Sequence, residues 1–434
     1  MNFKSSVSRG LSAIALTTVL FASSDASAAG FALNDISLTN IGRAFAGAGV
    51  VGDDYSAIGY NPAGVTLKGT GAQAGAVLIW EHGTVSGSAR KTGVPGGRAT
   101  GKDGISIPVA VPNMFAQYKI DDSFTFGIGI YAPLGLATKY DNDWFGSDYG
   151  ITSAVEAIDI APTLGYKMND HWSFGVSAIA RYGKVKMTNS SAATGHSDFD
   201  IDGWNAYGRI GVMYEHDENT RVGLSYTSVS TKVEHTLKGS HDFTGMPALL
   251  PPPATLNGEW VGGTEVRLPE SWLLSGYHRS GDFGYSASLR YTRWEYFNEF
   301  TLTSSSPLEY HTSLYNWKNV WSASLGVDWF YNDTWTFRAG LGYDQSPVRH
   351  SESRTVRIPD NDRVLMSVGF TYKINDRVKM DFGYTHLYLP TFVAKNGYSK
   401  TGMAPGVVQG AAGDVNVKYD FNAEVIGLQF QYDL

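Results

Sequence analysis

From about residue 71 to residue 434 the chain is a long series of segments in which apolar side chains recur at every second position. In the segment 335–344, large apolar residues occupy one face and polar or small residues occupy the other: Trp335, Phe337, Ala339, Leu341 and Tyr343 alternate with Thr336, Arg338, Gly340, Gly342 and Asp344. A period of two is typical of a β-strand whose two faces meet different surroundings. The pattern predicts an all-β protein.

The same alternation recurs at 203–215, 364–373, 378–385 and 426–432. In water such strands would leave several aromatic stripes exposed, whereas in a bilayer the same stripes face the lipid. The composition agrees, because 25 tyrosines, 21 phenylalanines and 11 tryptophans accompany only 17% charged residues. The strands therefore favour a transmembrane β-barrel, and a soluble β-sandwich enzyme is the alternative.

About fourteen such segments can be counted, and an even number is what a single-chain bacterial barrel requires. They start near residues 71, 110, 122, 153, 171, 203, 220, 265, 282, 315, 333, 362, 376 and 417. Short connections such as 169–170 alternate with long ones such as 83–109, 239–264 and 390–416. Short turns are typical of the periplasmic side of such barrels and long loops of the outside. We expect residues 70–434 to form an antiparallel barrel of about 14 strands.

The first residues have the organisation of a secretory signal peptide. Two basic residues precede an apolar run, and Ala26-Ser27-Ala28 has the small-x-small pattern that signal peptidase cleaves. We expect residues 1–28 to be the signal peptide and the mature chain to begin near Ala29. The sequence has 0 cysteines, so a large closed core or barrel must stabilise this exported chain in place of disulfides.

Composition and motifs also argue against several classes of function. The formal net charge of −7 makes a nucleic-acid partner an unsuitable assignment. The sequence contains no Gly-x-Ser-x-Gly elbow and no His pair at metal-binding spacing, and its 10 histidines are scattered. We therefore expect no enzymatic activity, no cofactor and no metal site.

The segment 29–69 does not follow the strand pattern, because glycines interrupt it at positions 42, 47, 49, 52 and 59. Its apolar residues suggest at most a short amphipathic helix. Gly-rich segments often approach other backbone closely, which favours a small hatch domain that plugs the lumen of the barrel. A flexible terminal arm outside the barrel is the alternative.

Several ordered motifs resemble one known family. They are Asn61-Pro62-Ala63 in the expected hatch, Leu268-Pro269-Glu270-Ser271-Trp272, Tyr291-Thr292-Arg293-Trp294, and the stretches 335–340, 344–347 and 358–363. Taken together and in this order, they are similar to the FadL/TodX family of outer-membrane transporters of long-chain fatty acids and other hydrophobic compounds. Asn61, Pro62 and Ala63 match that family's hatch motif.

The resemblance implies a fourteen-stranded barrel closed by an N-terminal hatch. It also implies that a hydrophobic ligand enters from outside and leaves sideways into the membrane, through a gap at a kinked third strand. The matching kink should lie at Pro133 and Gly135, because proline cannot donate to a ladder and glycine weakens one. An ordinary strand end beside the loop at Tyr140 is the alternative.

The resemblance also points to residues that would bind the ligand. In the family the mature N-terminus reaches into the pocket, and Phe31 is the matching residue, although Phe31 is equally a simple terminal residue. A carboxylate in an apolar lumen needs a cation. Lys318 lies an even number of positions from Ser322, Ser324 and Asp328, so on one strand all four would face the same side, which predicts that Lys318 faces the lumen. A solvated charge at a strand end is the alternative.

The second cation is less clearly marked. Arg181 faces the lumen by parity with Ser173, Gly175 and Ser177, while Lys184 and Lys186 lie further towards the loop and are alternatives. The loop 144–149 lacks the arginine of the family's usual Trp-x-Gly-Arg-Tyr. Because of these two departures, a neutral substrate such as an aromatic hydrocarbon remains an alternative, since it would need no cationic partner.

Capture of an oily ligand requires apolar surface outside the membrane. Leu249 and Leu250 in one long loop, and Trp144 in another, are the candidates, with a packed loop core as the alternative. We expect a monomer in the outer membrane of a Gram-negative bacterium, in contact with outer-membrane lipid and lipopolysaccharide.

The sequence therefore predicts passive uptake of hydrophobic molecules, most simply long-chain fatty acids. Each methylene removed from water gains about 0.8 kcal/mol, so no nucleotide hydrolysis is needed. Uptake of aromatic hydrocarbons or alkanes by the same route is the alternative, and a lipid-modifying outer-membrane enzyme is a distant one. A general polar porin is disfavoured by the expected plug.

Overall fold

The structure is a computed structural model of the chain. It describes residues 30, 32–92, 94–192, 195–230, 236–245, 257–265, 268–306, 308–395, 399–403, 406–409 and 414–434.

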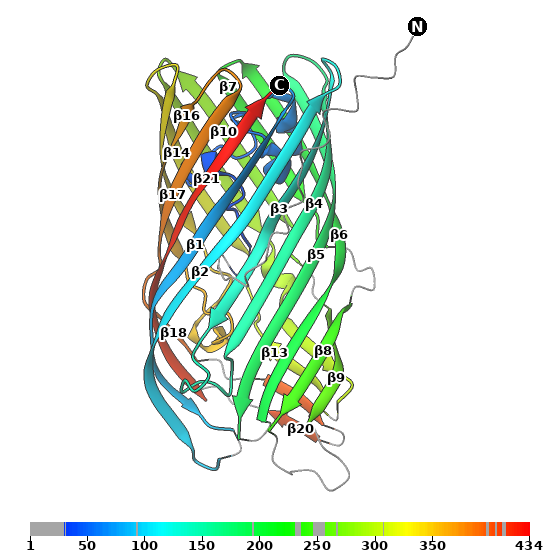
Figure 1. Cartoon of the computed structure of the whole chain (residues 1–434), viewed down its shortest axis with the longest axis vertical. Helices are drawn as coiled ribbons and strands as arrows, with labels where there is room; N and C mark the ends of the chain where they lie inside the picture. Colours follow the sequence, from blue (N-terminus) through cyan, green and yellow to red (C-terminus); the bar gives the residue numbers. More distant parts are fainter. Residues whose placement is uncertain are drawn as a thin grey trace.

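Fourteen strands form a closed antiparallel barrel, in agreement with the prediction (Figure 1). They are β1 (Gly71–Arg90), β2 (Arg98–Lys119), β3 (Phe124–Lys139), β4 (Thr152–Lys167), β5 (Trp172–Ser191), β6 (Gly195–Asp217), β7 (Thr220–Thr227), β10 (Ser271–Ser280), β11 (Phe283–Thr292), β14 (Val320–Phe330), β15 (Trp335–Asp344), β16 (Arg363–Lys373), β17 (Val378–Tyr388) and β21 (Val415–Asp433). The last strand pairs with the first along almost its whole length, so the barrel closes without a free edge.

Strands also occupy ranges that the sequence pattern marks as long loops. β1 and β2 remain paired as far as Arg90 and Arg98, well into the expected loop 83–109. Shorter strands extend the wall at the end opposite the C-terminus: β8 (Thr236–Thr244), β9 (Gly258–Glu265), β12 (Glu299–Ser304), β13 (Leu308–Leu314), β18 (Phe392–Ala394), β19 (Ser399–Met403) and β20 (Gly406–Gln409). The sequence pattern did not mark these segments as strands.

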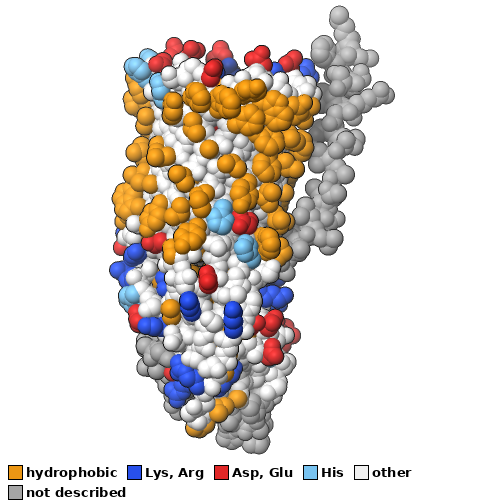
Figure 2. All heavy atoms as spheres, turned by 90° about the vertical axis from the view of Figure 1, so that its left-hand side faces the viewer, with side chains coloured by type: hydrophobic (Ala, Val, Ile, Leu, Met, Phe, Trp, Pro, Cys, Tyr) orange, Lys and Arg blue, Asp and Glu red, His pale blue; other side chains and the backbone are white. Residues whose placement is uncertain are grey.

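The outer face of the barrel carries a broad belt of apolar side chains (Figure 2). Residues of alternate positions are exposed there, such as Leu325, Leu341 and Phe430, while their chain neighbours face inward. Such a belt is the surface that a bilayer covers. None of the helices in the described ranges is long and apolar enough to cross a membrane.

The N-terminal segment fills the barrel lumen near the end that holds the C-terminus (Figure 1). It contains α1 (Leu38–Ile41), α2 (Ala57–Tyr60) and the 3-10 turn η1 (Pro62–Thr66). α1 packs against β16 and β17, whereas η1 packs against β4, β5 and β6. Nearly all of its side chains are buried, so the segment is a plug that contacts opposite walls.

A buried network of charges fixes the plug to the wall. The Arg43 guanidinium lies 2.9 Å from Asp53 in the same segment and 3.1 Å from Asp328 of β14. Arg338 of β15 lies 3.0 Å from Asp53 and 3.3 Å from Asp328, so two cations share two carboxylates. Buried charges persist only when they are paired in this way.

Replacing Arg43 by Met should loosen the plug. Asp53 and Asp328 would then have only Arg338 as a countercharge, and breaking a buried pair costs about 3–5 kcal/mol. We expect faster hydrogen exchange at amides 38–60 and a larger ion leak through the barrel in planar bilayers.

The matched control is Lys119→Met, which removes the exposed ion pair with Asp122. Exposed pairs contribute about 0–1 kcal/mol, so exchange and leak should stay at wild-type values. Equal behaviour of the two variants would contradict an anchoring role for the buried network.

Candidate ligand-binding site

The lumen on the outer side of the plug contains an apolar cavity of about 700 Å³, called here the outer chamber. Its lining comes mostly from β3 to β6 and from loops, and its apolar members are Leu134, Val155, Ala157, Val185, Met187, Leu237, Leu268, Phe297, Phe300, Tyr315 and Ile358. Its charged and amide members are Glu156, Arg181, Lys184 and Asn205. Mostly apolar walls with a few polar groups are typical of sites that bind a hydrophobic ligand.

A second cavity of about 890 Å³, called here the inner chamber, lies against the plug. Leu134, Arg181 and Leu268 line both cavities, so the two chambers are neighbours. The inner chamber is more polar, because Arg209 and Arg290 line it together with Arg181. A molecule moving inward therefore passes from apolar walls to walls with cationic groups.

Arg181 faces the lumen, as its parity predicts. Its guanidinium donates two hydrogen bonds to Asp159, of 2.7 and 3.0 Å, and a third of 2.6 Å to the hydroxyl of Tyr207. Asp159 is fully buried on β4 and was not identified from the sequence. The structure thus brings Arg181 to the junction of the chambers with its charge already compensated.

Two further arginines were missed by sequence reasoning, although both have lumen parity within their strands. Arg209 of β6 donates to the Ile58 carbonyl at 2.8 Å and to the Tyr131 hydroxyl at 3.2 Å, so it connects the plug to the wall. Arg290 of β11 is half-buried, and no carboxylate oxygen of the described residues lies within 4 Å of its guanidinium.

Lys318 lies two residues before β14 begins. Its side chain is half-buried, its backbone N–H donates to the Pro347 carbonyl at 2.9 Å, and it does not line either chamber. The alternatives Lys184 and Lys186 pair with carboxylates of β6, Lys184 with Asp200 at 3.0 Å. The structure therefore brings Arg181, and not Lys318, to the wall between the chambers.

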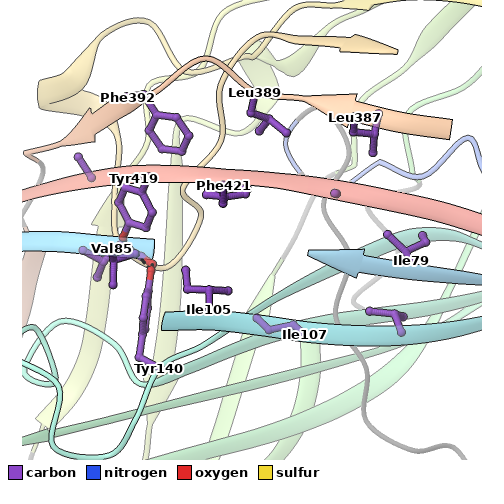
Figure 3. Close-up of a cluster of buried hydrophobic side chains, with 14 of the residues drawn as sticks. Ile79, Val85, Ile105, Ile107, Tyr140, Leu387, Leu389, Phe392, Tyr419 and Phe421 are labelled. Atoms are coloured by element: carbon purple, nitrogen blue, oxygen red, sulfur yellow. Dashed lines mark hydrogen bonds between the residues drawn. The ribbon is translucent and has the colours of Figure 1, made fainter. Parts of the chain in front are cut away.

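Trp144 is buried and so does not supply exposed apolar surface. Its ring stacks on Tyr140 at 3.8 Å, and its indole N–H donates to the Gly150 carbonyl at 2.7 Å. Tyr140 in turn hydrogen-bonds Tyr419 at 2.7 Å, and Tyr419 stacks on Phe392 (Figure 3). This core fills the lumen beside the outer chamber, which is the packed-loop alternative. Phe31, Leu249 and Leu250 lie outside the described residues.

β3 is irregular at Pro133, where a kink was expected. Its pairing with β2 ends at Tyr131, and its register with β4 shifts between Tyr131 and Leu134. From Leu134 to Lys139, β3 has β4 as its only barrel neighbour among the described strands, and Gly135 lies in this part. Proline within a strand produces this effect because it has no N–H to donate.

The N-terminal segment 32–36, called here the arm, lies against this unpaired edge. Ala32 forms an isolated antiparallel bridge with Leu134, and the Leu33 N–H donates to the Pro133 carbonyl at 2.8 Å. The arm thus replaces β2 as a neighbour of β3 beyond the irregularity. Asp35 of the arm is buried, and burial raises its pKa to about 7, so its negative charge is weakened near neutral pH.

The motif Asn61-Pro62-Ala63 fits against glycines of the wall. The Asn61 side chain accepts from the Ala63 N–H at 3.0 Å, which caps η1, and it donates to the Val212 carbonyl at 3.2 Å. A Cβ atom at Gly175 would overlap the backbone of Pro62 and Ala63. Glycine at this position allows the close approach of plug and wall.

Comparison with known proteins identifies the family. The model of the outer membrane protein transport protein family (OMPP1/FadL/TodX) matches residues 19–434. The chain belongs to this family. It is a β-barrel of the Gram-negative outer membrane.

The sequences of individual relatives agree with this family assignment. The long-chain fatty acid transport protein of Escherichia coli (strain K12) is 32% identical over 409 residues, covering 84% of this chain and 88% of that protein. The outer membrane protein P1 of Haemophilus influenzae is 26% identical, over 82% of this chain and 85% of that protein.

Solved structures show the same fold. A FadL homologue of Pseudomonas aeruginosa superposes with a TM-score of 0.78 at 22% identity, covering 93% of this chain and 100% of that one. The toluene transporter TodX of Pseudomonas putida has a TM-score of 0.67 at 14% identity, covering 94% and 100%.

In this FadL/TodX family barrel, Gly175→Ala should displace the plug. The added methyl group would overlap backbone atoms of η1, which cannot move aside as a flexible side chain would. We expect increased proteolytic cleavage of the plug in the folded barrel, together with lower uptake of any ligand that depends on plug position.

Gly208→Ala is the control, because the nearest atom to a Cβ there is the Ser177 carbonyl oxygen at 3.7 Å, an ordinary contact. This variant should retain the wild-type cleavage pattern. If Gly175→Ala also retained it, the plug would not be held by close packing at this glycine.

Proposed function

We propose that the protein takes up long-chain fatty acids passively across the outer membrane and releases them sideways. The observation that supports this most is the order of its cavities: an apolar outer chamber adjoins a cationic inner chamber, which lies beside the unpaired edge of β3. The apolar walls suit a hydrocarbon chain and the cations suit a carboxylate. No chemical change of the substrate is proposed.

Transfer of the hydrocarbon chain supplies the driving force. Each methylene moved from water into the outer chamber gains about 0.8 kcal/mol, and a chain that continues into the bilayer keeps this gain. Entry therefore runs downhill without an energy source, and net flux follows whatever removes the ligand from the membrane.

The arm is the proposed gate on the sideways route. It occupies the edge of β3 through the bridge of Ala32 with Leu134 and the hydrogen bond of Leu33 to Pro133. Arm and β3 share few contacts compared with two full strands, so the arm can leave this edge more readily than β2 can leave β1. Phe31, next to the arm, is proposed to respond to the ligand.

Neutral aromatic hydrocarbons or alkanes are the second candidate substrate. The fold shared with the toluene transporter TodX permits this assignment. A neutral hydrocarbon gains nothing from the arginines of the inner chamber, which is why we favour an acid. Leu249 and Leu250 are proposed to capture either ligand outside the membrane. Lys318 and Arg181 are proposed to attract the carboxylate head group of a fatty acid. Trp144 would contribute only through the packing of its loop.

A disulfide between arm and β3 should stop uptake. Residues directly opposite in an antiparallel bridge have Cα atoms about 4.5–5.5 Å apart, within reach of a disulfide. We expect Ala32→Cys with Leu134→Cys to abolish uptake of radiolabelled oleate by cells that lack other transporters, and a reductant to restore it.

Ile130→Cys with Ile160→Cys is the matched control, because these residues are opposite each other on β3 and β4 and their link leaves the arm free. Oleate uptake should then be the same before and after reduction. Undiminished uptake with a fully formed arm disulfide would exclude the sideways route. The disulfide tests the route and not the ligand. Uptake of toluene by the wild-type protein is therefore measured beside uptake of oleate, and it shows which of the two substrates is carried.

Lipopolysaccharide is proposed as the partner of the outer surface. Figure 2 shows Lys and Arg side chains beyond the apolar belt, on the side away from the C-terminus. Lys102 of β2 and Lys418 of β21 both lie opposite Ser86 of β1 and both are exposed. Their charges suit the phosphates of a glycolipid headgroup at this level.

The double variant Lys102→Glu, Lys418→Glu should copurify with less lipopolysaccharide, because two attractive charges become repulsive. The amount can be measured by mass spectrometry of the purified barrel. Lys373→Glu is the control, since this residue lies at the turn between β16 and β17 at the opposite end. Equal lipopolysaccharide in all three proteins would contradict the assignment.

A further inference from the structure

Arg290 is the one arginine of the inner chamber without a protein anion or hydrogen-bond acceptor among the described residues. It faces inward from β11, since its neighbours Leu289 and Tyr291 face outward, and it lies opposite Leu273 of β10 and Ser322 of β14. Arg181 and Arg209, in contrast, are engaged by Asp159 and by the Ile58 carbonyl.

The position of Arg290 is also special, because a third cavity of about 380 Å³ meets the inner chamber there. Four residues line both spaces: Asn34, Arg290, Ser322 and Asp344. Asn34 belongs to the arm, and its carbonyl accepts a 2.6 Å hydrogen bond from the Tyr60 hydroxyl of the plug. A ligand held at Arg290 would therefore lie against the arm and the wall at once.

Asp344 is the nearest competitor for this cation. It lies on the same wall, but its carboxylate is 3.9 Å from the Arg363 guanidinium and is not within 4 Å of Arg290. The Arg290 guanidinium thus presents free N–H donors to a cavity with low-dielectric walls. An unpaired cation in such surroundings is costly, and an anion that fits the cavity relieves that cost.

We infer that Arg290 forms a second, inner subsite for the carboxylate head group of an amphiphilic acid, occupied after the acid leaves the outer chamber. The inference rests on the proposed uptake of fatty acids and adds the point at which the head group stops. The ligand class follows from the approach: Leu134 and Leu268 line both chambers together with Arg181, so the path suits an anion that carries an apolar chain.

Occupation of this subsite places the ligand beside the exit. The inner chamber is lined by Tyr131, Pro133 and Leu134, the residues at which β3 parts from β2. A head group at Arg290 would contact Asn34, next to the residues that bridge the arm to β3. Binding and opening of the gate would then involve the same short segment.

The test compares an acid with its neutral analogue. Purified Arg290→Met protein in detergent should bind oleate about tenfold or more weakly than wild type, because charge-assisted hydrogen bonds are lost. Its affinity for oleyl alcohol should be unchanged, which also shows that the variant is folded. Arg290→Lys should recover part of the oleate affinity.

Arg279→Met is the control, since this residue is on the neighbouring β10 at its exposed end. If Arg290→Met bound oleate as tightly as this control, the subsite would be refuted while fatty-acid uptake stood. If wild type bound oleyl alcohol but not oleate, the proposed substrate itself would be wrong. Equal loss of oleate and oleyl alcohol in Arg290→Met would show a structural role and would likewise overturn the subsite.

Discussion

The structure depends on one constraint: inside a bilayer every backbone N–H and C=O must find a partner within the protein. β21 meets this constraint by pairing with β1, which leaves no edge. The irregularity at Pro133 breaks it locally, because β3 loses β2 as a neighbour beyond Tyr131. The arm supplies a substitute donor there, because the Leu33 N–H donates to the Pro133 carbonyl. Its position is therefore a consequence of the gap, and any movement of the arm exposes the same groups again.

A parallel constraint acts on charge inside the lumen. The Arg43, Asp53, Asp328 and Arg338 network between plug and wall, and the Arg181–Asp159 pair within the wall, are buried charges compensated by opposite charges. Each of these ion pairs resists separation, because moving one partner away leaves the other charge buried without a countercharge. Motion of the plug as a whole is therefore expensive. The arm is held instead by its backbone contacts with β3 and by the buried side chains of Leu33 and Ile36.

Sequence parity placed the barrel strands and the inward face of Arg181 correctly, because a period of two is a local property of each strand. It did not identify Asp159, since which residue meets Arg181 depends on the register between β4 and β5. Lys318 precedes β14, so the alternation of that strand does not fix the direction of its side chain. The burial of Trp144 depends on Tyr140 and its contact with Tyr419, which lies 279 residues away in the chain. No local pattern contains that information.

On the proposed function, the contrast between the two chambers gives the lumen its selectivity. In the outer chamber, apolar walls favour any hydrocarbon chain in proportion to its buried area and do not distinguish an acid from an alkane. In the inner chamber, Arg181 is paired with Asp159 and Arg209 donates to neutral oxygen atoms, so on the proposed function discrimination falls to Arg290. A neutral hydrocarbon reaching Arg290 leaves its guanidinium unsolvated, whereas a carboxylate solvates it. On this proposal, the residue that attracts an acid also opposes a neutral molecule, and selection takes place at the last step before the membrane.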